Sequence, residues 1–436
     1  MVFFLSFSCH ALTSQTTKNH IEGSAPYLTF DGGRTRVVNT NDLLGITLSN
    51  GSRYTPSNNT SSSSRPIQLS TAGESFADIG MLVPTDTNSV ALSSLIGPPY
   101  NYWGDDDGDS AVTATGSLSL SIVDKYNQAV SRSSVLTVCN APYRVTLSST
   151  DGTLSTRYGV PNRSNFSASI VTYYINPKVT PVVCFARPNT VFASGPYAGP
   201  ASMWDPYDGF IPQSTGPSSY GRNFPTTGAN NLYFDLLIGG VNQPLYWSLV
   251  SRGGITATMT NSTATSVRVT LIGPYATTSQ HSSSSPDSVS TPSLPQTFEL
   301  VGRDNNGNPV IKYGFTLKQW FIHRGAKRDN YSNILSWCDS IGYRLVKVKD
   351  LTNASLSSSV VIPGATPSSP GNHIMRHIGS GFFTEWGTMP QYSGAGFLDG
   401  YYLTSDQYNS GHQFSVRTIY GDARSSNNDY GLCAYP

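Results

Sequence analysis

Apolar and polar residues alternate strictly along residues 255–260, and this two-residue period constrains the fold more than any other sequence feature. A strand with this pattern buries one face and exposes the other. The pattern returns at residues 267–271 after a short polar turn, which predicts a hairpin. Residues 118–122 and 145–147 alternate in the same way, so we expect many half-buried strands.

A second hairpin is predicted around residues 304–307, where Asp, Asn and Gly tolerate the positive φ of a tight turn. Strands at this spacing over the first 313 residues indicate stacked β-sandwiches. Two stretches rich in Ser and Thr, 57–64 and 277–295, are interpreted as connections because they are too polar to offset the entropy cost of ordering. Convincing strands lie on both sides of the second stretch, so we place no domain boundary there.

The pattern changes after residue 314. Asp329 or Ser332 can cap a helix whose apolar side chains recur at helical spacing, and Gly342 would end it. A second short helix is expected from Asp350 through Leu356. Strand-like aromatic segments follow at 382–383, 401–403 and 414–419. This part of the chain therefore predicts a mixed α+β domain.

Charged residues make up only 12% of the chain, and 27 basic against 26 acidic residues give a net charge of +1. No basic block could neutralise a run of phosphates, so nucleic-acid binding is disfavoured. No apolar run reaches the roughly 18 residues that a membrane-spanning helix requires.

The start of the chain and its cysteines indicate export. The apolar segment 2–7 resembles the end of a secretory signal peptide, which we place at residues 1–12; a plain hydrophobic terminus is the alternative. If Cys9 leaves with that segment, four cysteines remain, which suits two disulfides in an oxidising compartment. Three pairings are possible, and proximity in the chain favours Cys139 with Cys184 and Cys338 with Cys433.

The acidic run 105–109 resembles the start of a calcium loop, since clustered carboxylates suit hard cations. An EF-hand loop beginning at Asp105 would need Gly at 110 and Glu at 116, where the chain has Ser110 and Gly116. A solvated acidic turn is therefore favoured, with an irregular calcium site as the alternative.

His373 and His377 have the four-residue spacing of a zinc pair on a helix. The glycines around them argue against a helix and no third ligand is evident, so structural histidines are favoured. The sequence also lacks a Gly-x-Ser-x-Gly elbow, a P-loop and a dinucleotide-binding glycine pattern. No metal or other cofactor is expected.

The last 123 residues, 314–436, contain an ordered series of motifs: Trp337-Cys338, Gly342 to Leu345, Asp350 to Ala354, Glu385-Trp386-Gly387, Tyr392, Tyr401 to Ser405, and Tyr430 to Cys433. With this series, residues 314–436 resemble the C-terminal lectin-like module of the invasin and intimin adhesins. Residues 26–33 and 234–314 are similar to the Zir-type and Rat-type exoproteins of enterobacteria. Val346 stands where related modules often have Pro, and Leu403 where they often have Trp; we expect a looser turn and an altered exposed contact.

The resemblance implies a mainly β protein whose tandem immunoglobulin-like sandwiches end in an α+β C-type-lectin-like domain. It implies a non-enzymatic adhesin, secreted or outer-membrane-associated at the cell surface, that binds a host-cell or bacterial-surface protein. The sandwiches would act as a spacer. Invasin-type adhesins usually carry their own outer-membrane barrel and this sequence supplies none, so we expect a separate barrel translocator as a second partner. Sugar-binding lectin modules hold calcium with tripeptides that residues 315–436 lack, so no calcium-dependent glycan site is expected.

The predicted partner-binding surface consists of aromatic and Met side chains in Gly-rich, polar sequence, as recognition surfaces often do. Burial in the domain's own core is the alternative for one residue of each Tyr pair, and for Trp386 it is the favoured interpretation. Contact and packing are equally open for the loop residues. The set is Trp386, Met389, Tyr392, Phe397, Tyr401, Tyr402 and Tyr408.

These patterns predict four domains after the signal peptide, with boundaries at 13–135, 136–230, 231–313 and 314–436. The rival function is a secreted glycan-binding or glycan-processing enzyme with accessory β domains. Its sign would be a pair of carboxylates at glycosidase separation. The candidates are Glu299, Glu385, Asp399 and Asp406.

Overall fold

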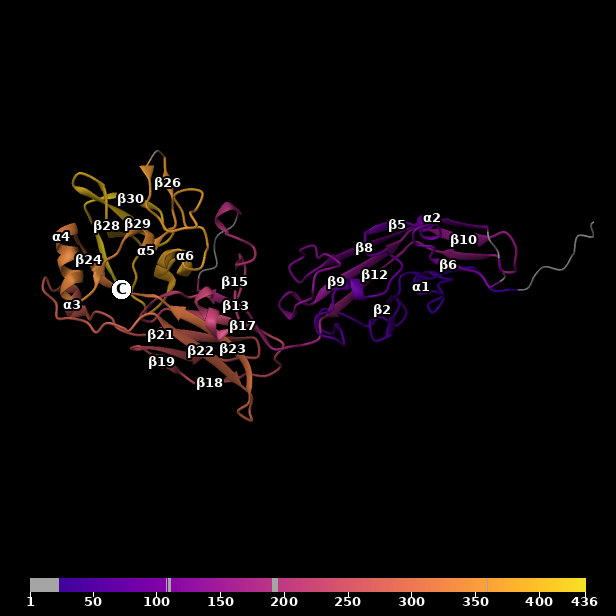
Figure 1. Cartoon of the computed structure of the whole chain (residues 1–436), viewed down its shortest axis with the longest axis horizontal. Helices are drawn as coiled ribbons and strands as arrows, with labels where there is room; N and C mark the ends of the chain where they lie inside the picture. The colour runs from indigo at the N-terminus through magenta and orange to yellow at the C-terminus, as the bar shows by residue number, and fades with distance from the viewer. Residues whose placement is uncertain (1–22, 107, 109–110, 190–194, 359) are drawn as a thin grey trace, which may run out of the picture. The chain divides into compact units, whose positions relative to one another are not determined.

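The computed structural model describes residues 23–106, 108, 111–189, 195–358 and 360–436, which form two compact units (Figure 1). Unit 1 ends at Val179, and unit 2 runs from Thr180 to Pro436. The predicted signal peptide 1–12 lies outside the described residues, as do Asp107 and Asp109 of the acidic run. The mainly β fold predicted from the sequence is confirmed in both units.

Unit 1 is built around a five-stranded sheet, and its strands alternate between buried and exposed side chains as predicted. A three-stranded sheet shares its core, in which Val145 and Tyr173 cluster with Leu154 and Phe166. The larger sheet has the order β4 (Ile67–Gln68), β12 (Ser169–Asn176), β9 (Tyr143–Ser149), β8 (Ser117–Val123) and β5 (Ser89–Ala91), with β4 parallel to β12. The smaller has the order β11 (Arg163–Phe166), β10 (Gly152–Thr156) and β7 (Val112–Thr115). Unit 1 also contains the short elements β1 (Tyr27–Leu28), β6 (Trp103–Gly104), β2 (Ile46–Thr47), β3 (Arg53–Tyr54), α1 (Thr40–Leu43) and α2 (Leu92–Leu95).

The first half of unit 2 is a sandwich of a seven-stranded and a three-stranded sheet. The predicted hairpins are both present: β20 (Ile255–Thr260) pairs with β21 (Ser266–Ile272), and β22 (Gln296–Arg303) pairs with β23 (Pro309–Leu317). The large sheet has the order β14 (Trp204–Asp205), β15 (Gly209–Phe210), β13 (Val182–Pro188), β17 (Tyr233–Gly239), β21 (Ser266–Ile272), β20 (Ile255–Thr260) and β19 (Val250–Arg252). The small one has the order β18 (Tyr246–Trp247), β22 (Gln296–Arg303) and β23 (Pro309–Leu317).

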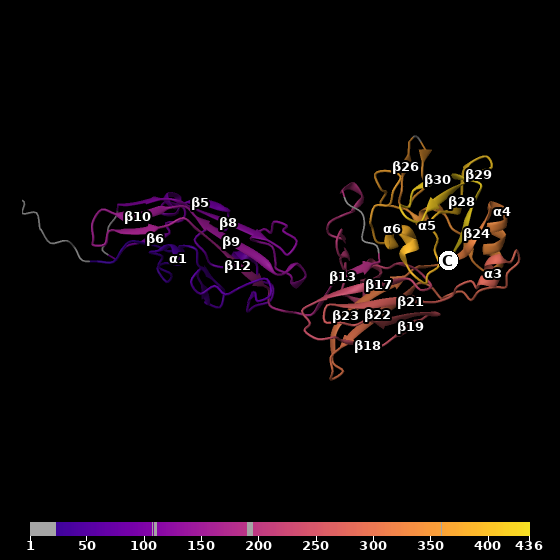
Figure 2. The ribbon, with the colours of Figure 1, turned by 180° about the vertical axis from the view of Figure 1, so that it is seen from behind.

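The second half of unit 2 is an α+β arrangement around another sheet, visible from both sides in Figures 1 and 2. Its central strands are β24 (Gln319–Asn330), β31 (Asn428–Tyr435) and β28 (Tyr401–Asn409), followed by β29 (His412–Arg417) and β30 (Ala423–Ser426). At the opposite edge β16 (Thr227–Ala229) pairs in parallel with β24. Helices α4 (Tyr331–Ser340), α5 (Val348–Leu351) and α6 (Phe382–Trp386) pack around it, with β25 (Arg344–Leu345) beside β31 and a hairpin of β26 (Leu356–Ser357) and β27 (Val360–Val361).

The two halves of unit 2 share one hydrophobic core. Buried side chains of the sandwich, such as Phe234 and Phe298, belong to the same cluster as Trp337 and Trp386 of the α+β half. Strand β16 comes from the chain that precedes the sandwich strand β17, yet it pairs with β24. The sandwich and the α+β half therefore form one folded body.

The predicted domain boundaries differ from this organisation. Strands β8 and β9 pair across the boundary placed after residue 135, and β23 runs through the boundary at 313. The range 136–230 contributes strands to both units. Alternation identifies strands but does not say which strands pair, and the turns that suggested boundaries lie inside sheets.

Both polar stretches predicted as connections are ordered through hydrogen bonds to neighbouring elements. In 57–64, the side chain of Asn59 donates to the backbone carbonyl of Thr172 in β12 (2.8 Å). In 277–295, the residues of α3 (Thr278–Ser282) lie beside β24, and the Trp337 indole donates to a carbonyl of this helix (2.9 Å). Contacts with neighbouring elements therefore offset the entropy cost of ordering these polar segments.

Local expectations in the α+β half need three corrections. Helix α4 has the predicted apolar face, but its N-cap is Asn330, whose side chain accepts from the Asn333 backbone. The second short helix ends at Leu351, and Leu356 belongs to a strand. Residues 382–383 begin a helix, where a strand was expected, because Gly381 and Gly387 flank a single buried turn.

Candidate partner-binding site

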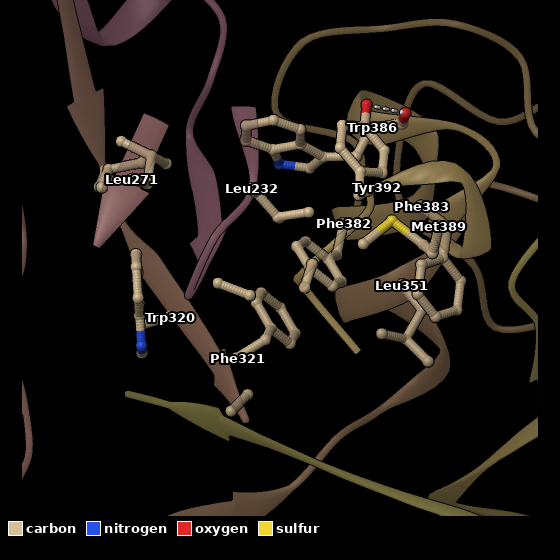
Figure 3. Packing of buried hydrophobic residues seen from close by; sticks show 14 of the residues in the cluster. Leu232, Leu271, Trp320, Phe321, Leu351, Phe382, Phe383, Trp386, Met389 and Tyr392 are labelled. Carbon is tan, nitrogen blue, oxygen red and sulfur yellow. Dashed lines mark hydrogen bonds between the residues drawn. The ribbon is translucent and has the colours of Figure 1, made fainter. Parts of the chain in front are cut away.

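Most of the predicted partner-binding surface is the core of unit 2, and this prediction is wrong for those residues. Trp386 and Met389 have no exposed surface, and Tyr392 and Phe397 are 2% and 5% exposed. Figure 3 shows several of these side chains packed together. Tyr402 is also fully buried. Side chains without accessible surface cannot contact a partner, so the packing alternative holds for them.

Trp386 joins the two halves of unit 2. Its indole N–H donates to the backbone carbonyl of Thr227 in β16 (3.1 Å), and its ring lies 5.0 Å from the Phe224 ring. The Tyr392 hydroxyl donates to the Trp386 carbonyl (2.7 Å), shown as a dashed line in Figure 3. Buried Trp and Tyr combine large apolar area with a hydrogen-bonding group that needs a partner. Both requirements are met inside the protein.

Glu385 is fully buried next to this tryptophan. Its Oε1 accepts from the Thr226 hydroxyl and the Gly379 backbone N–H (both 2.8 Å), and its Oε2 accepts from the Thr227 backbone N–H (3.0 Å) and hydroxyl (2.6 Å). The Thr226 backbone N–H is shared by both oxygens (3.1 and 3.0 Å). Burial raises the pKa of Glu385, and these hydrogen bonds oppose that shift. The Glu385 carboxyl therefore links α6 to the segment of Thr226 and Thr227 through hydrogen bonds.

The other carboxylates proposed for an enzyme also have structural partners. Glu299 pairs with Lys312 (3.0 Å) and accepts from the Tyr220 hydroxyl, and these contacts lower its pKa. Asp399 lies 3.4 Å from Arg417 at the surface. Asp406 accepts from the first backbone N–H of α5 (2.6 Å). Each carboxylate is thus engaged in holding a different part of the fold.

The histidine pair and the acidic turn have structural surroundings as well. His373 lies between the rings of Tyr197 (5.3 Å) and Tyr420 (5.6 Å), and residues 371–378 are not helical. His377 hydrogen-bonds within its own loop. In the acidic run, Asp106 forms an exposed ion pair with Arg36 (2.6 Å).

The two residues that depart from the pattern of the invasin-like and intimin-like modules are both buried. Leu403 and Val346 have no exposed surface. The expectation of an altered exposed contact at Leu403 is therefore wrong, because this side chain faces the core from the central strand β28.

A Tyr–Arg surface, formed by His373, Tyr401, Arg417, Tyr420 and Arg424, remains open to solvent on the α+β half. The Arg424 guanidinium lies 3.7 Å from the centre of the Tyr401 ring, and Arg417 lies 6.0 Å from Tyr401 and 5.8 Å from Tyr420. The side chains of Arg424 and Arg417 are 48% and 34% exposed. Tyr420 is 41% exposed.

The fold explains why these side chains meet. Tyr401 and Arg417 are paired across β28 and β29, and Arg424 follows on the neighbouring strand β30. The Tyr401 hydroxyl donates to Asp422 (2.6 Å); burial, with this hydrogen bond, raises its pKa to about 12. The buried Asp429 holds Arg424 through two contacts of 3.1 and 3.2 Å.

Of the predicted surface, Tyr401 and Tyr408 keep partial exposure, and only Tyr401 belongs to the Tyr–Arg surface. Tyr408 packs edge-on against Phe414 (5.0 Å). Sequence reasoning missed Arg417, Tyr420 and Arg424. One signal for them was available in the sequence: Arg417 and Arg424 flank a Tyr-Gly turn in a chain with only 12% charged residues. Arg and Tyr are enriched at interface hot spots, so this segment could have been predicted as a contact surface.

The predicted Cys338–Cys433 disulfide is present, with a Cα–Cα distance of 5.6 Å, and links α4 to β31. Cys139 and Cys184 lie in different units, so their pairing stays a prediction that non-reducing peptide mapping can check. No helix in the described ranges has the length and apolar character to cross a membrane.

Comparison with solved structures finds bacterial adhesins at low similarity. Invasin, a bacterial integrin-binding protein, matches with 13% identity and a TM-score of 0.36 over 76% of this chain and 52% of its own, so this chain spans about half of that structure. A 282-residue C-terminal fragment of intimin, solved in complex with the intimin-binding domain of the translocated intimin receptor, matches with 11% identity and a TM-score of 0.32 over 75% of this chain and 94% of its own. An intimin mutant from EHEC O157:H7 matches with 14% identity and a TM-score of 0.29 over 50% of this chain and 93% of its own.

No protein-family description matches the sequence, and no curated protein does. At these identities and TM-scores the matches carry no functional argument. The fold assignment therefore rests on the strand pairing and the shared core of the chain itself.

Proposed function

We propose that this chain is an exported, non-enzymatic binding protein that attaches to a protein on a host cell or a neighbouring bacterium. The Tyr–Arg surface of unit 2 is the contact site. The observation that carries this proposal is the exposed stack of Arg424 and Arg417 on Tyr401 and Tyr420. The sequence resemblance to invasin and intimin adhesins supports the same function.

The composition and rigidity of this surface favour recognition. Tyrosine and arginine lose little freedom on binding when their positions are already fixed, and both are enriched among residues that dominate binding energy. Tyr401 is fixed by Asp422, and Arg424 by the buried Asp429. Tyr401, Arg417 and Arg424 lie on three neighbouring strands that pair with one another.

The exposed edges of the two guanidinium groups define the chemistry of the partner. Arginine binds carboxylates in the plane of its guanidinium, and a tyrosine ring offers apolar area beside it. Asp399 holds Arg417 through two surface contacts of 3.4 Å to one carboxylate oxygen, which a partner could replace at little cost. The partner is therefore a protein surface that presents carboxylate side chains next to apolar ones.

The other parts of the chain have supporting roles in this proposal. Unit 1 acts as the spacer, because the sandwich in unit 2 shares its core with the α+β half. The Cys338–Cys433 disulfide fits an oxidising extracellular setting. The structural partners of all four candidate carboxylates favour binding over glycan hydrolysis.

The test is binding of the fluorescently labelled full chain to host cells and to bacteria, measured by flow cytometry. Tyr420→Ala and Arg417→Ala should each weaken binding about 30-fold, since loss of one interface anchor costs about 2 kcal/mol. Tyr207→Ala, at an exposed tyrosine in the sandwich half, is the matched control and should bind like the wild type. Equal binding by Tyr420→Ala, Arg417→Ala and the wild type would refute the Tyr–Arg surface as the contact.

A further inference from the structure

A cavity of about 460 Å³ opens in unit 2 where the end of β21 meets α3 and β24. Its mouth has an apolar wall formed by Ile272 and Tyr275, which are 40% and 58% exposed. Asn230, His281 and His323 are among the polar residues that line it. We call it the His–Asn cavity. It uses none of the residues of the Tyr–Arg surface.

The lining of the His–Asn cavity carries no formal charge at neutral pH. Its only titratable side chains other than Tyr275 are His281 and His323, whose rings lie 5.3 Å apart. Burial, with a smaller effect of His281, lowers the pKa of His323 to about 4. Burial lowers the pKa of His281; a hydrogen bond to the Ala276 backbone opposes that shift, and the positive charge of Arg324 adds to it. Because both imidazoles are neutral, the cavity favours an uncharged ligand.

Several polar groups in the wall have no protein partner in the described ranges. Asn230 accepts from the Gly273 backbone N–H with its Oδ1 (3.1 Å), which leaves its Nδ2 donor free. Asn231 donates to the Gly394 carbonyl (3.0 Å), which leaves its Oδ1 acceptor free. The Nε2 of His281 is buried and has no hydrogen-bond partner among the described residues. A buried ring nitrogen without a partner is a cost that a ligand hydroxyl would remove, because a hydroxyl can both donate and accept.

His323, in contrast, has no hydrogen-bonding capacity left for a ligand. Its Nδ1 accepts from the Gly325 backbone N–H (3.0 Å), so its Nε2 carries the proton and donates to the Ala395 carbonyl (3.0 Å). This ring therefore acts as a fixed wall next to His281.

We propose that the His–Asn cavity binds a neutral pyranose unit of a glycan without a metal ion. The free Asn230 donor, the free Asn231 acceptor and the unpartnered His281 nitrogen suit hydroxyl groups, which donate and accept at once. The exposed ring of Tyr275 suits the C–H face of a sugar, because an aromatic face is electron-rich and attracts weakly positive hydrogens. A purely apolar side chain would leave all three polar groups unsatisfied.

The test is saturation-transfer NMR on the full chain at pH 7. The probes are the methyl glycosides of glucose, galactose, mannose and N-acetylglucosamine, the corresponding free sugars, and N-acetyl-L-tyrosinamide as a mimic of an aromatic peptide side chain. We expect saturation transfer to at least one sugar, unchanged by EDTA. Preference for the glycoside over its free sugar would identify the end of a glycan chain as the source, and the reverse a soluble sugar.

Two variants locate the binding. Tyr275→Ala should raise the Kd about tenfold or more, as loss of a contact aromatic typically does. Asn230→Asp keeps the acceptor for Gly273 but removes the free donor, and should also weaken binding. Tyr246→Ala, at a tyrosine that is 64% exposed elsewhere in unit 2, is the matched control. Transfer to the tyrosinamide alone, no transfer to any sugar, or equal sugar binding in Tyr275→Ala and wild type would overturn the proposal.

Discussion

Replacing Glu385 with Gln should destabilise unit 2 although the side chain keeps its size. Both carboxyl oxygens face backbone N–H groups: Oε1 faces Gly379, Oε2 faces Thr227, and both face Thr226. An amide group can retain one acceptor oxygen. Whichever way the amide turns, its NH₂ opposes at least one of these N–H groups, which loses its acceptor. The substitution thus turns a satisfied buried cluster into one with two opposed donors.

The magnitude follows from those two donors. A buried polar group without a partner costs about 1–3 kcal/mol, so the orphaned N–H and the misplaced amide hydrogen together cost about 3 kcal/mol. For a unit of this size, about 3 kcal/mol corresponds to a fall in melting temperature of roughly 6–12 °C. Glu299→Gln is the matched control: it removes a solvent-exposed ion pair with Lys312, which should cost less than about 1 kcal/mol.

The assay is differential scanning calorimetry of the full chain, which records the transition of unit 2 in each variant. We expect Glu385→Gln to lower that transition far more than Glu299→Gln. A Glu385→Gln protein that melts like the wild type would show that the buried carboxyl is not acting as an acceptor for these N–H groups, and the argument would fail.

Three further predictions concern the same unit. Trp386→Ala should lower the free energy of unfolding by about 3–5 kcal/mol, measured by urea denaturation, because it leaves a large cavity; a smaller loss, with the native spectrum kept, would contradict its role in the core. Protonation of buried His323 is disfavoured in the folded state, so the contribution of this residue to stability should be complete above pH 6.5. The free energy of unfolding should fall by about 3 kcal/mol as the pH drops to about 4. Calorimetry of His323→Gln should show a smaller change in stability with pH over that window. The double variant Cys338→Ala, Cys433→Ala removes a disulfide that links residues 95 positions apart. Its free energy of unfolding, measured by urea denaturation, should fall by about 4–5 kcal/mol. Unchanged stability would contradict the chain-entropy account.

Local patterns in the sequence were sufficient for much of the secondary structure. The alternation at 255–260 predicts a strand because each side chain faces either the core or solvent, and β20 has that pattern. Helix α4 was predictable from the spacing of its apolar residues, although the choice of Asn330 as its cap was not. The Cys338–Cys433 disulfide followed from an even cysteine count and proximity along the chain.

The candidate site could not be predicted because its decisive contacts are long-range. Gly-rich sequence around Trp386 is compatible with both contact and burial, and the partner that decides between them, Thr227, is 159 positions earlier in the chain. The Tyr–Arg surface depends on the register that brings Arg424 next to Tyr401, and no local pattern encodes that register. Domain boundaries also depend on long-range contacts, since β16 precedes the sandwich strand β17 in the chain but pairs with β24 of the α+β half.

The position of β31 in its sheet has a consequence for how the protein is made. This strand lies between β24 and β28, so the centre of the sheet is the last strand of unit 2 that the ribosome produces. Until residue 435 has emerged, β24 and β28 lack their shared neighbour and Cys338 lacks its partner. Sheets that depend on distant segments form slowly, because the chain must close long loops first. The α+β sheet of unit 2 is therefore expected to remain incomplete throughout the synthesis of this unit, and to close only once its final strand inserts.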